Sequence, residues 1–200
     1  MDKVSVYENI RDMIFNGELK RGEKITEMQL ADKLGVSRTP IREALKKLET
    51  EKLIANNRVA NPTERDYQDI FEMRILIEKF AVRRAAQFLT ESDIAELERL
   101  VEIGYKGTPE EVMEGNKLFH ETLVNATKNK VMIEYFNQMQ SIIYLFRKKV
   151  IYQKRPGLID EHKEIVEAIK KHDVDLAETL MEKHLLADLE FGLYHMRKVD

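Results

Sequence analysis

Two sets of side chains in this 200-residue sequence have the type and spacing to do chemistry. The first lies in the run SRTPIREALKKL, where Ile41, Ala44, Leu45 and Leu48 recur at helical spacing and turn cations and a hydroxyl to the opposite side. Arginine pairs with guanine O6 and N7, whereas lysine and hydroxyl groups hold phosphates. The outward set therefore suits duplex DNA, with the arginines as base readers: Arg38, Thr39, Arg42 and Lys46.

The second set consists of three histidines on three predicted helices. His120 shares a face with Asn116, four residues earlier, while His162 and His184 fall on the apolar stripes of two later helices. Imidazoles that project from facing helices into one core suit zinc, nickel, iron or manganese. We predict a divalent metal site formed by Asn116, His120, His162 and His184, with zinc and nickel as the favoured ions.

Plainer interpretations of the inward polar residues stay open. Each histidine can be a core residue bonded to a carbonyl or carboxylate, although one ion would satisfy all of them. Arg74 can pair with Glu78 at i+4, or it can receive a carboxylate ligand that completes the coordination of the ion. His172 and His195 are expected outside the site, at a helix end and in the last turn.

The basic run needs two helices and a turn to present it. Thr26 and Gly35 mark the start and end of a helix over about 27–34. The hydroxyl of Ser37 can cap the next helix, whose first turn tolerates Pro40. Two helices joined by a glycine-containing turn form the helix-turn-helix pattern.

Flanking segments complete an N-terminal head at residues 1–62. A supporting helix is predicted at about 3–16, and the residues after Leu53 favour a small hairpin, or wing. Its Arg58 can enter the adjacent minor groove.

The histidines need a helical bundle around them. A polar break at Pro62 leads into a linker at residues 63–65. Helical patterns then follow at about 66–88, 91–103, 109–127, 130–153, 158–171 and 174–197. Without an alternating strand pattern, residues 66–200 are expected to form an all-α bundle of six helices, and the whole chain a mainly α fold.

Composition bounds the class of protein. The absence of cysteine excludes disulfides and thiolate metal sites. No apolar run of 18 residues and no signal peptide is evident, so we expect a cytoplasmic protein without a membrane partner. The net charge of −3 is divided unevenly, positive in the first 65 residues and negative in the rest, which suggests separate tasks for the two parts.

The run GELKRGEKITEMQLADKLGVSRTPIREALKKLETEKLI resembles, almost position for position, the winged-helix domain of the GntR family of bacterial transcription regulators. The resemblance implies DNA contacts from Ser37, Arg38, Thr39 and Arg42, with a wing contribution from Arg58. The chain departs from the family at Met28, where several relatives have a DNA-contacting arginine, and at a wing tip that lacks their usual glycine.

The run RDYQDIFEMRILIEKFAVRRAA, followed by a six-helix body, is similar to the FCD ligand-binding domain of the FadR-like branch of that family. Many such domains use an Asp-x-x-x-His pair and two later histidines as metal ligands. Asn116 stands at the carboxylate position here, so it implies a weaker ligand or one that acts through water.

Together these patterns predict a regulator that binds a pseudo-palindromic operator as a homodimer and responds, as a repressor, to a small carboxylate effector bound at the metal. Two alternatives stay open: a metal-dependent hydrolase, and a regulator whose ligand site contains no metal. The lack of an HExxH motif or nucleophile elbow favours a protein that is not an enzyme.

Overall fold

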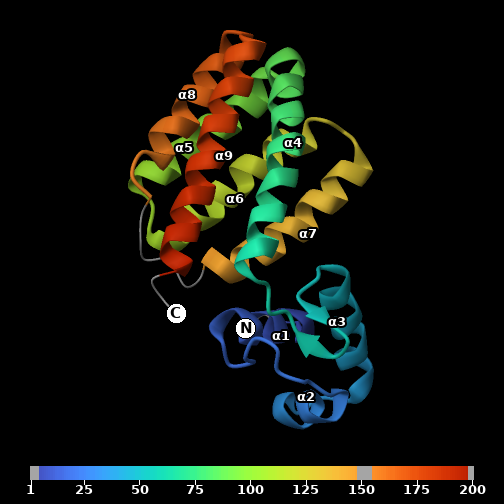
Figure 1. The fold of residues 1–200 in the computed structure, drawn as a ribbon. Coiled ribbons are helices and arrows are strands. Elements are labelled where there is room, and N and C mark those ends of the chain that lie inside the picture. Colours follow the sequence, from blue (N-terminus) through green and yellow to red (C-terminus); the bar gives the residue numbers. More distant parts are fainter. Residues whose placement is uncertain (1–4, 148–154, 198–200) are drawn as a thin grey trace.

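The computed structural model describes residues 5–147 and 155–197 and has the expected mainly helical fold. Figure 1 shows an N-terminal head beneath a larger body of helices. Among the described residues, no helix has the length and hydropathy that a membrane crossing requires.

The head contains three helices and a two-stranded wing. Their bounds are α1 Val6–Asn16, α2 Glu27–Leu34, α3 Arg38–Thr50, β1 Ile54–Ala55 and β2 Arg58–Val59. Thr26 accepts a hydrogen bond from the Gln29 amide, and Gly35 ends α2 in the left-handed conformation, as predicted. Ser37 occupies the N-cap of α3, but its side chain makes no cap hydrogen bond, so the predicted capping role is wrong. Ser37 is exposed beside Arg38.

The wing turns without glycine. Ile54 pairs with Val59 and Ala55 with Arg58, which leaves Asn56 and Asn57 as a two-residue loop. Both have positive φ, 51° and 57°. Asparagine tolerates this conformation better than other non-glycine residues, so it replaces the glycine expected at the wing tip.

The body consists of six helices in the described residues. Their bounds are α4 Glu64–Phe88, α5 Glu91–Lys106, α6 Pro109–Asn125, α7 Lys130–Arg147, α8 Leu158–Lys170 and α9 Val174–Met196. The predicted end of the fourth body helix, at 153, lies outside the described residues.

Two helix boundaries differ from the sequence prediction for identifiable reasons. Thr63 forms a capping box with Asp66, so α4 begins at Glu64 and absorbs the last two residues of the predicted linker. The predicted helix end at 103 is wrong, because Gly104 lies inside α5, where a Cβ would collide with the Ile159 side chain of the neighbouring α8. Gly104 thus serves close helix packing.

The end of α7 joins the head to the body. Leu145 is 4% exposed and belongs to the apolar core of the head, although it stands in the body by sequence. Arg21 of the head donates to the Leu145 carbonyl at 2.6 Å, and the Phe15 and Tyr144 rings lie 4.3 Å apart between centroids. The two parts therefore share one packed junction.

Candidate functional site

The predicted DNA contacts of the helix-turn-helix lie together on one exposed edge, formed by the start and outer face of α3. Ser37, Arg38, Thr39, Arg42 and Lys46 are all exposed. The Arg38 and Arg42 side chains retain 65% and 59% of their accessible surface. Figure 1 shows α2, which leads into the start of α3, at the end of the head away from the body, so the body does not cover this edge.

Glu27 at the start of α2 holds both arginines. The Arg42 Nε and Nη2 donate to the two Glu27 oxygens at 2.8 and 2.9 Å, and the Arg38 Nη2 lies 3.2 Å from Oε2. The hydrogen bond from Arg42 lowers the pKa of Glu27, so this carboxylate is ionised at neutral pH. Glu27 thus forms an acidic clamp on the two arginines that are the candidate base readers, and this contact was not predicted from the sequence.

The wing arginine is engaged within the head. Arg58 is exposed, but its Nη1 donates to the Gly22 carbonyl at 2.9 Å, and its backbone forms a bridge with Lys24. A contact of Arg58 with the minor groove stays a prediction that requires this bond to open.

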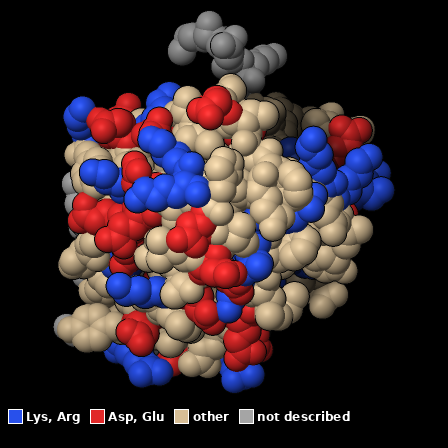
Figure 2. Space-filling view, turned by 90° about the horizontal axis from the view of Figure 1, so that it is seen from above, with Lys and Arg blue, Asp and Glu red and all other residues tan. Residues whose placement is uncertain are grey.

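The body offers no comparable basic surface on the face that Figure 2 shows. Lys and Arg side chains are interleaved there with Asp and Glu, at the end of the molecule opposite the head. A mixed surface of this kind does not concentrate the positive potential that DNA phosphates require.

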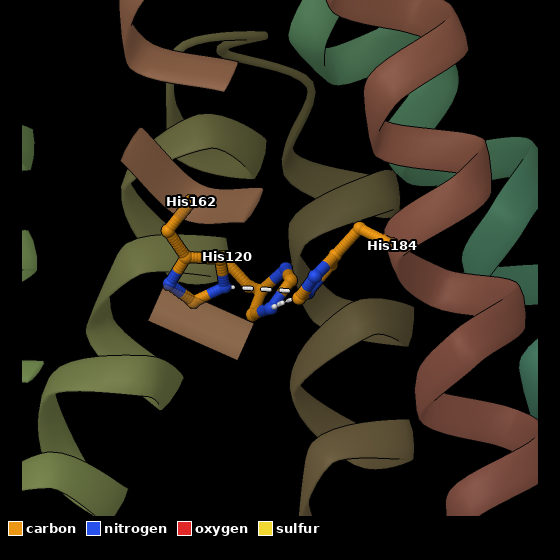
Figure 3. Close-up of side chains that lie close together, drawn as sticks. All are labelled: His120, His162 and His184. Carbon is orange, nitrogen blue, oxygen red and sulfur yellow. Dashed lines mark hydrogen bonds between the residues drawn. The ribbon is translucent and has the colours of Figure 1, made fainter. Parts of the chain in front are cut away.

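The three predicted histidines converge in the middle of the body. Figure 3 shows His120 of α6, His162 of α8 and His184 of α9 pointing toward one another. The His184 Nε2 lies 3.2 Å from the His162 Nε2 and 3.3 Å from the His120 Nε2. Each residue is at most 2% exposed. The Phe119 ring stacks on His162 at 3.9 Å between centroids and fixes the plane of that imidazole.

Carboxylates hold the outer nitrogens of two histidines. The His120 Nδ1 bonds to Glu78, and the His184 Nδ1 lies 2.8 Å from Glu161 Oε2. Burial raises the pKa of Glu78, but the charge of Arg74 and the hydrogen bonds with Arg74 and His120 outweigh burial and hold the pKa at about 2. Burial likewise raises the pKa of Glu161, yet its bonds with Arg155 and His184 bring it to about 2. An ionised carboxylate at Nδ1 requires Nδ1 to donate, which leaves the Nε2 lone pair facing inward.

This arrangement fits a divalent ion. Burial lowers the pKa of His120 to about 4, against the charge of Glu78, so the imidazole is neutral at pH 7 and able to ligate. Inward lone pairs about 3.3 Å apart repel one another unless a cation lies between them. Two nitrogens bound to one tetrahedral ion at roughly 2.0–2.1 Å lie about 3.3–3.4 Å apart, close to the distances from the His184 Nε2 to those of His162 and His120.

Arg74 forms the ion pair with Glu78, the plainer of its two predicted roles, and keeps donors for the other role, which is to bind a carboxylate ligand. Its Nε donates to Glu78 Oε1 at 2.6 Å, and both residues are fully buried. Its Nη1 and Nη2 are buried with no hydrogen-bond partner among the described residues. Unsatisfied buried donors on a cation are costly, so this fork is suited to an anion or water.

Asn116 lies beside the histidine cluster. It is 6% exposed on α6, one turn before His120, and it lines a cavity of about 320 Å³. Arg155 and Asp188 line the same cavity, and the Arg155 Nε donates to Asp188 Oδ1 at 2.8 Å. Direct ligation by Asn116 stays a prediction.

The remaining histidines stand apart from this cluster. His172 is exposed at the end of α8 and its Nδ1 lies 2.8 Å from the Ala86 carbonyl oxygen, while the His195 ring contacts Phe191 in the last turn of α9.

Sequence reasoning missed three of the carboxylates around the arginines and histidines. Glu27 and Glu161 act across helices and Asp188 bonds to Arg155 ahead of α8, so no short-range spacing links them to these partners. Only Glu78 carried a local signal, because it stands one turn from Arg74.

Comparisons with known proteins agree with the two-part organisation. Residues 3–58 match the family model "Bacterial regulatory proteins, gntR family", and residues 69–187 match the FCD domain. The HTH-type transcriptional regulator YdhC of Bacillus subtilis (strain 168) is 32% identical over 96% of this chain and 90% of its own length. The gluconate operon transcriptional repressor of Bacillus licheniformis is 30% identical over 86% of this chain and 77% of its own length.

Solved structures share the fold. E. coli McbR/YncC superposes with a TM-score of 0.78 at 24% identity and covers 96% of both chains. A GntR family member from Pseudomonas syringae pv. tomato str. DC3000 gives a TM-score of 0.61 at 24% identity, over 96% of this chain and 84% of its own. The relatives described here are transcription regulators, which confirms the expectation that the chain is not an enzyme.

Proposed function

We propose a specific role for this chain, which belongs to the GntR family of DNA-binding transcription regulators, in the FadR-like branch with a C-terminal FCD domain. It is a homodimeric repressor controlled by a small organic acid. The acid binds at a metal centre in the body and changes the placement of the DNA-reading head. The observation that carries the proposal is the cluster of three buried histidines in the body, whose candidate ligand atoms all lie within 4.8 Å of one another.

The DNA-reading part of the proposal assigns base contacts to Arg38 and Arg42. Ser37, Thr39 and Lys46 hold phosphates from the same exposed edge, and Arg58 reaches the minor groove. Glu27 competes with DNA for both arginines, because its oxygens hold them at hydrogen-bond distance in the free chain.

The metal-centre part assigns the ion to His120, His162 and His184, with Asn116 as a fourth ligand, direct or through water. A bound divalent ion supplies a Lewis acid that attracts a carboxylate. Arg74 attracts the same carboxylate, because its Nη1 and Nη2 bond to none of the described residues and are suited to carboxylate oxygens. Zinc and nickel suit neutral imidazole ligands.

The dimer part draws support from exposed apolar side chains on α4. Met73, Leu76 and Phe80 are 49%, 66% and 48% exposed and recur at helical spacing. A symmetric pair of chains predicts two half-sites in the operator. The gluconate operon repressors among the relatives support the repressor assignment.

The junction at the end of α7 supports a mechanical link between the two parts. Phe146 lines the cavity beside the histidines, and the Arg21 guanidinium of the head lies 5.5 Å from its ring centroid. The adjacent Leu145 is buried in the core of the head. A ligand that displaces Phe146 therefore acts on the head directly.

The test of this function uses a duplex selected from random sequence by the chain itself. Zinc-loaded protein is expected to bind the duplex and to release it when one acid from a panel of small carboxylates is added, as measured by fluorescence anisotropy. Arg74→Lys keeps a cation beside Glu78 but removes the fork, so it should retain zinc and require at least tenfold more acid. Release that is equal in Arg74→Lys and wild type, or no release by any acid, contradicts the proposal.

The metal-free alternative predicts a different result for the same protein. A regulator whose histidines only pack would contain no stoichiometric ion after purification under metal-replete conditions and would respond to the acid after chelation. The metal-centre proposal predicts one ion per chain and loss of the response on chelation.

A further inference from the structure

The cavity of about 320 Å³ begins one helical turn from the histidine cluster. Asn116, Leu158 and Asp188 line it, and each stands four residues from one of the three histidines. One turn of helix rises about 5.4 Å, so the cavity is the next layer of the bundle. The histidines themselves are almost fully enclosed. An acid whose charged end is held at the cluster therefore has to place the rest of its body in this cavity.

The wall of the cavity is mainly apolar. Its apolar side chains include Val112, Met113, Phe146, Ile159, Phe191 and Met196. They come from α6, α7, α8 and α9, so they surround the space. Burial of hydrocarbon against such a wall is favourable by roughly 25 cal/mol per Å² of apolar surface.

The charged groups of the wall already have partners within the protein. Arg155 donates to Asp188 at 2.8 Å and to Glu161 Oε1 at 3.0 Å, and the Tyr105 hydroxyl donates to Asp160 at 2.6 Å. A ligand hydroxyl competes with these contacts when it bonds to Arg155 or to the Tyr105 hydroxyl, and against the apolar wall it loses its hydrogen bonds with water. Both alternatives cost free energy.

We infer that the acid recognised by this chain carries a hydrocarbon body and not a polyhydroxylated one. The inference rests on the proposed function, because it takes the charged end of the acid to lie at the histidine cluster. It separates this chain from a sensor of gluconate, the compound after which the operon controlled by two of its relatives is named. The volume of the cavity lies near the lower end of the range for small-molecule sites, about 300–1,000 Å³, which suits a monocarboxylate of modest length.

Hexanoate and gluconate provide a matched pair of probes, since both have six carbons and one carboxylate. Calorimetric titration of the zinc-loaded chain should show hexanoate binding at least tenfold more tightly than gluconate. Octanoate should bind more tightly still, by roughly fourfold for each added methylene.

A cavity-filling variant tests the location. Val112→Phe places a larger side chain in the cavity and should weaken octanoate binding at least tenfold while zinc content and the circular dichroism spectrum stay unchanged. The matched control is Val131→Phe, the same substitution at a 63% exposed valine of α7, which should bind octanoate like the wild type.

The outcomes separate this inference from the proposed function. Tighter binding of gluconate than of hexanoate by zinc-loaded protein overturns the inference and leaves the metal centre standing. Failure of every carboxylate to bind overturns both. If the chain retains no zinc, the metal centre fails, and a preference for octanoate over gluconate in metal-free protein still supports the hydrocarbon body. Unchanged octanoate binding in folded Val112→Phe overturns the assignment to this cavity.

Discussion

The head and the body each pair an arginine with a glutamate, in opposite surroundings. In the head, Arg42 and Glu27 are 59% and 25% exposed at their side chains. In the body, Arg74 and Glu78 are 1% and 0% exposed. Water screens an exposed pair, so its partners exchange readily, whereas a buried pair leaves an uncompensated charge when one partner is lost. In the head, DNA phosphates can therefore replace Glu27 as the partner of the arginines. In the body, the buried pair holds the histidines in a fixed network.

The largest expected effect tests the buried pair. Glu78→Gln should lower the free energy of unfolding of metal-free protein by about 3–5 kcal/mol, because Arg74 and His120 lose their shared carboxylate. Urea denaturation measures the change. Glu27→Gln is the matched substitution in the head and should leave the urea midpoint unchanged. Equal effects of the two variants would remove the contrast between the regions.

The second prediction concerns the ion. Zinc at one hundred times its dissociation constant should stabilise the wild type by about 2.7 kcal/mol. His162→Ala should lose both the bound zinc and this stabilisation, because it removes one of three converging ligands. His195 lies outside the cluster, so His195→Ala should keep the bound zinc and the stabilisation. Metal analysis and thermal unfolding give the readouts, and retention of zinc by His162→Ala would place the ion elsewhere.

The third prediction concerns base reading by the head. Arg42→Ala should weaken binding to a selected duplex by roughly ten- to a hundredfold, and more than binding to unrelated DNA. Lys46→Ala should act on all sequences alike and reduce the salt slope by about one. An equal loss on every duplex for Arg42→Ala would assign this arginine to a phosphate.

The smallest expected effect sharpens the role of the acidic clamp. Glu27→Gln should raise the affinity for all duplexes by a few fold, since it removes a carboxylate that competes with phosphate for Arg38 and Arg42. Anisotropy titrations at one fixed salt concentration measure the change. Weaker binding by this variant would mean that Glu27 positions the arginines for DNA.

Local signals in the sequence predicted most of the fold. Helix starts at Thr90 and Thr108 and helix ends at Gly17 and Gly35 could be predicted because caps act within a few residues. The helix end predicted just before Gly104 was wrong, since this residue is glycine because of a contact with Ile159, which is distant in the sequence.

The candidate sites show the same limit. The histidines and outward arginines could be predicted because helical periodicity alone assigns a side chain to a face. The partners Glu27 and Glu161 could not, because their roles arise from tertiary contacts between helices. The insertion of Leu145 into the head likewise depends on how two domains meet, which no local pattern encodes.

The metal centre is tested most directly by anomalous diffraction from crystals of the full chain grown with zinc. The account predicts one strong peak among the side chains of His120, His162 and His184, about 2.0–2.1 Å from each Nε2. Zinc peaks elsewhere in the crystal, with only a water molecule or no density between these three imidazoles, would contradict it.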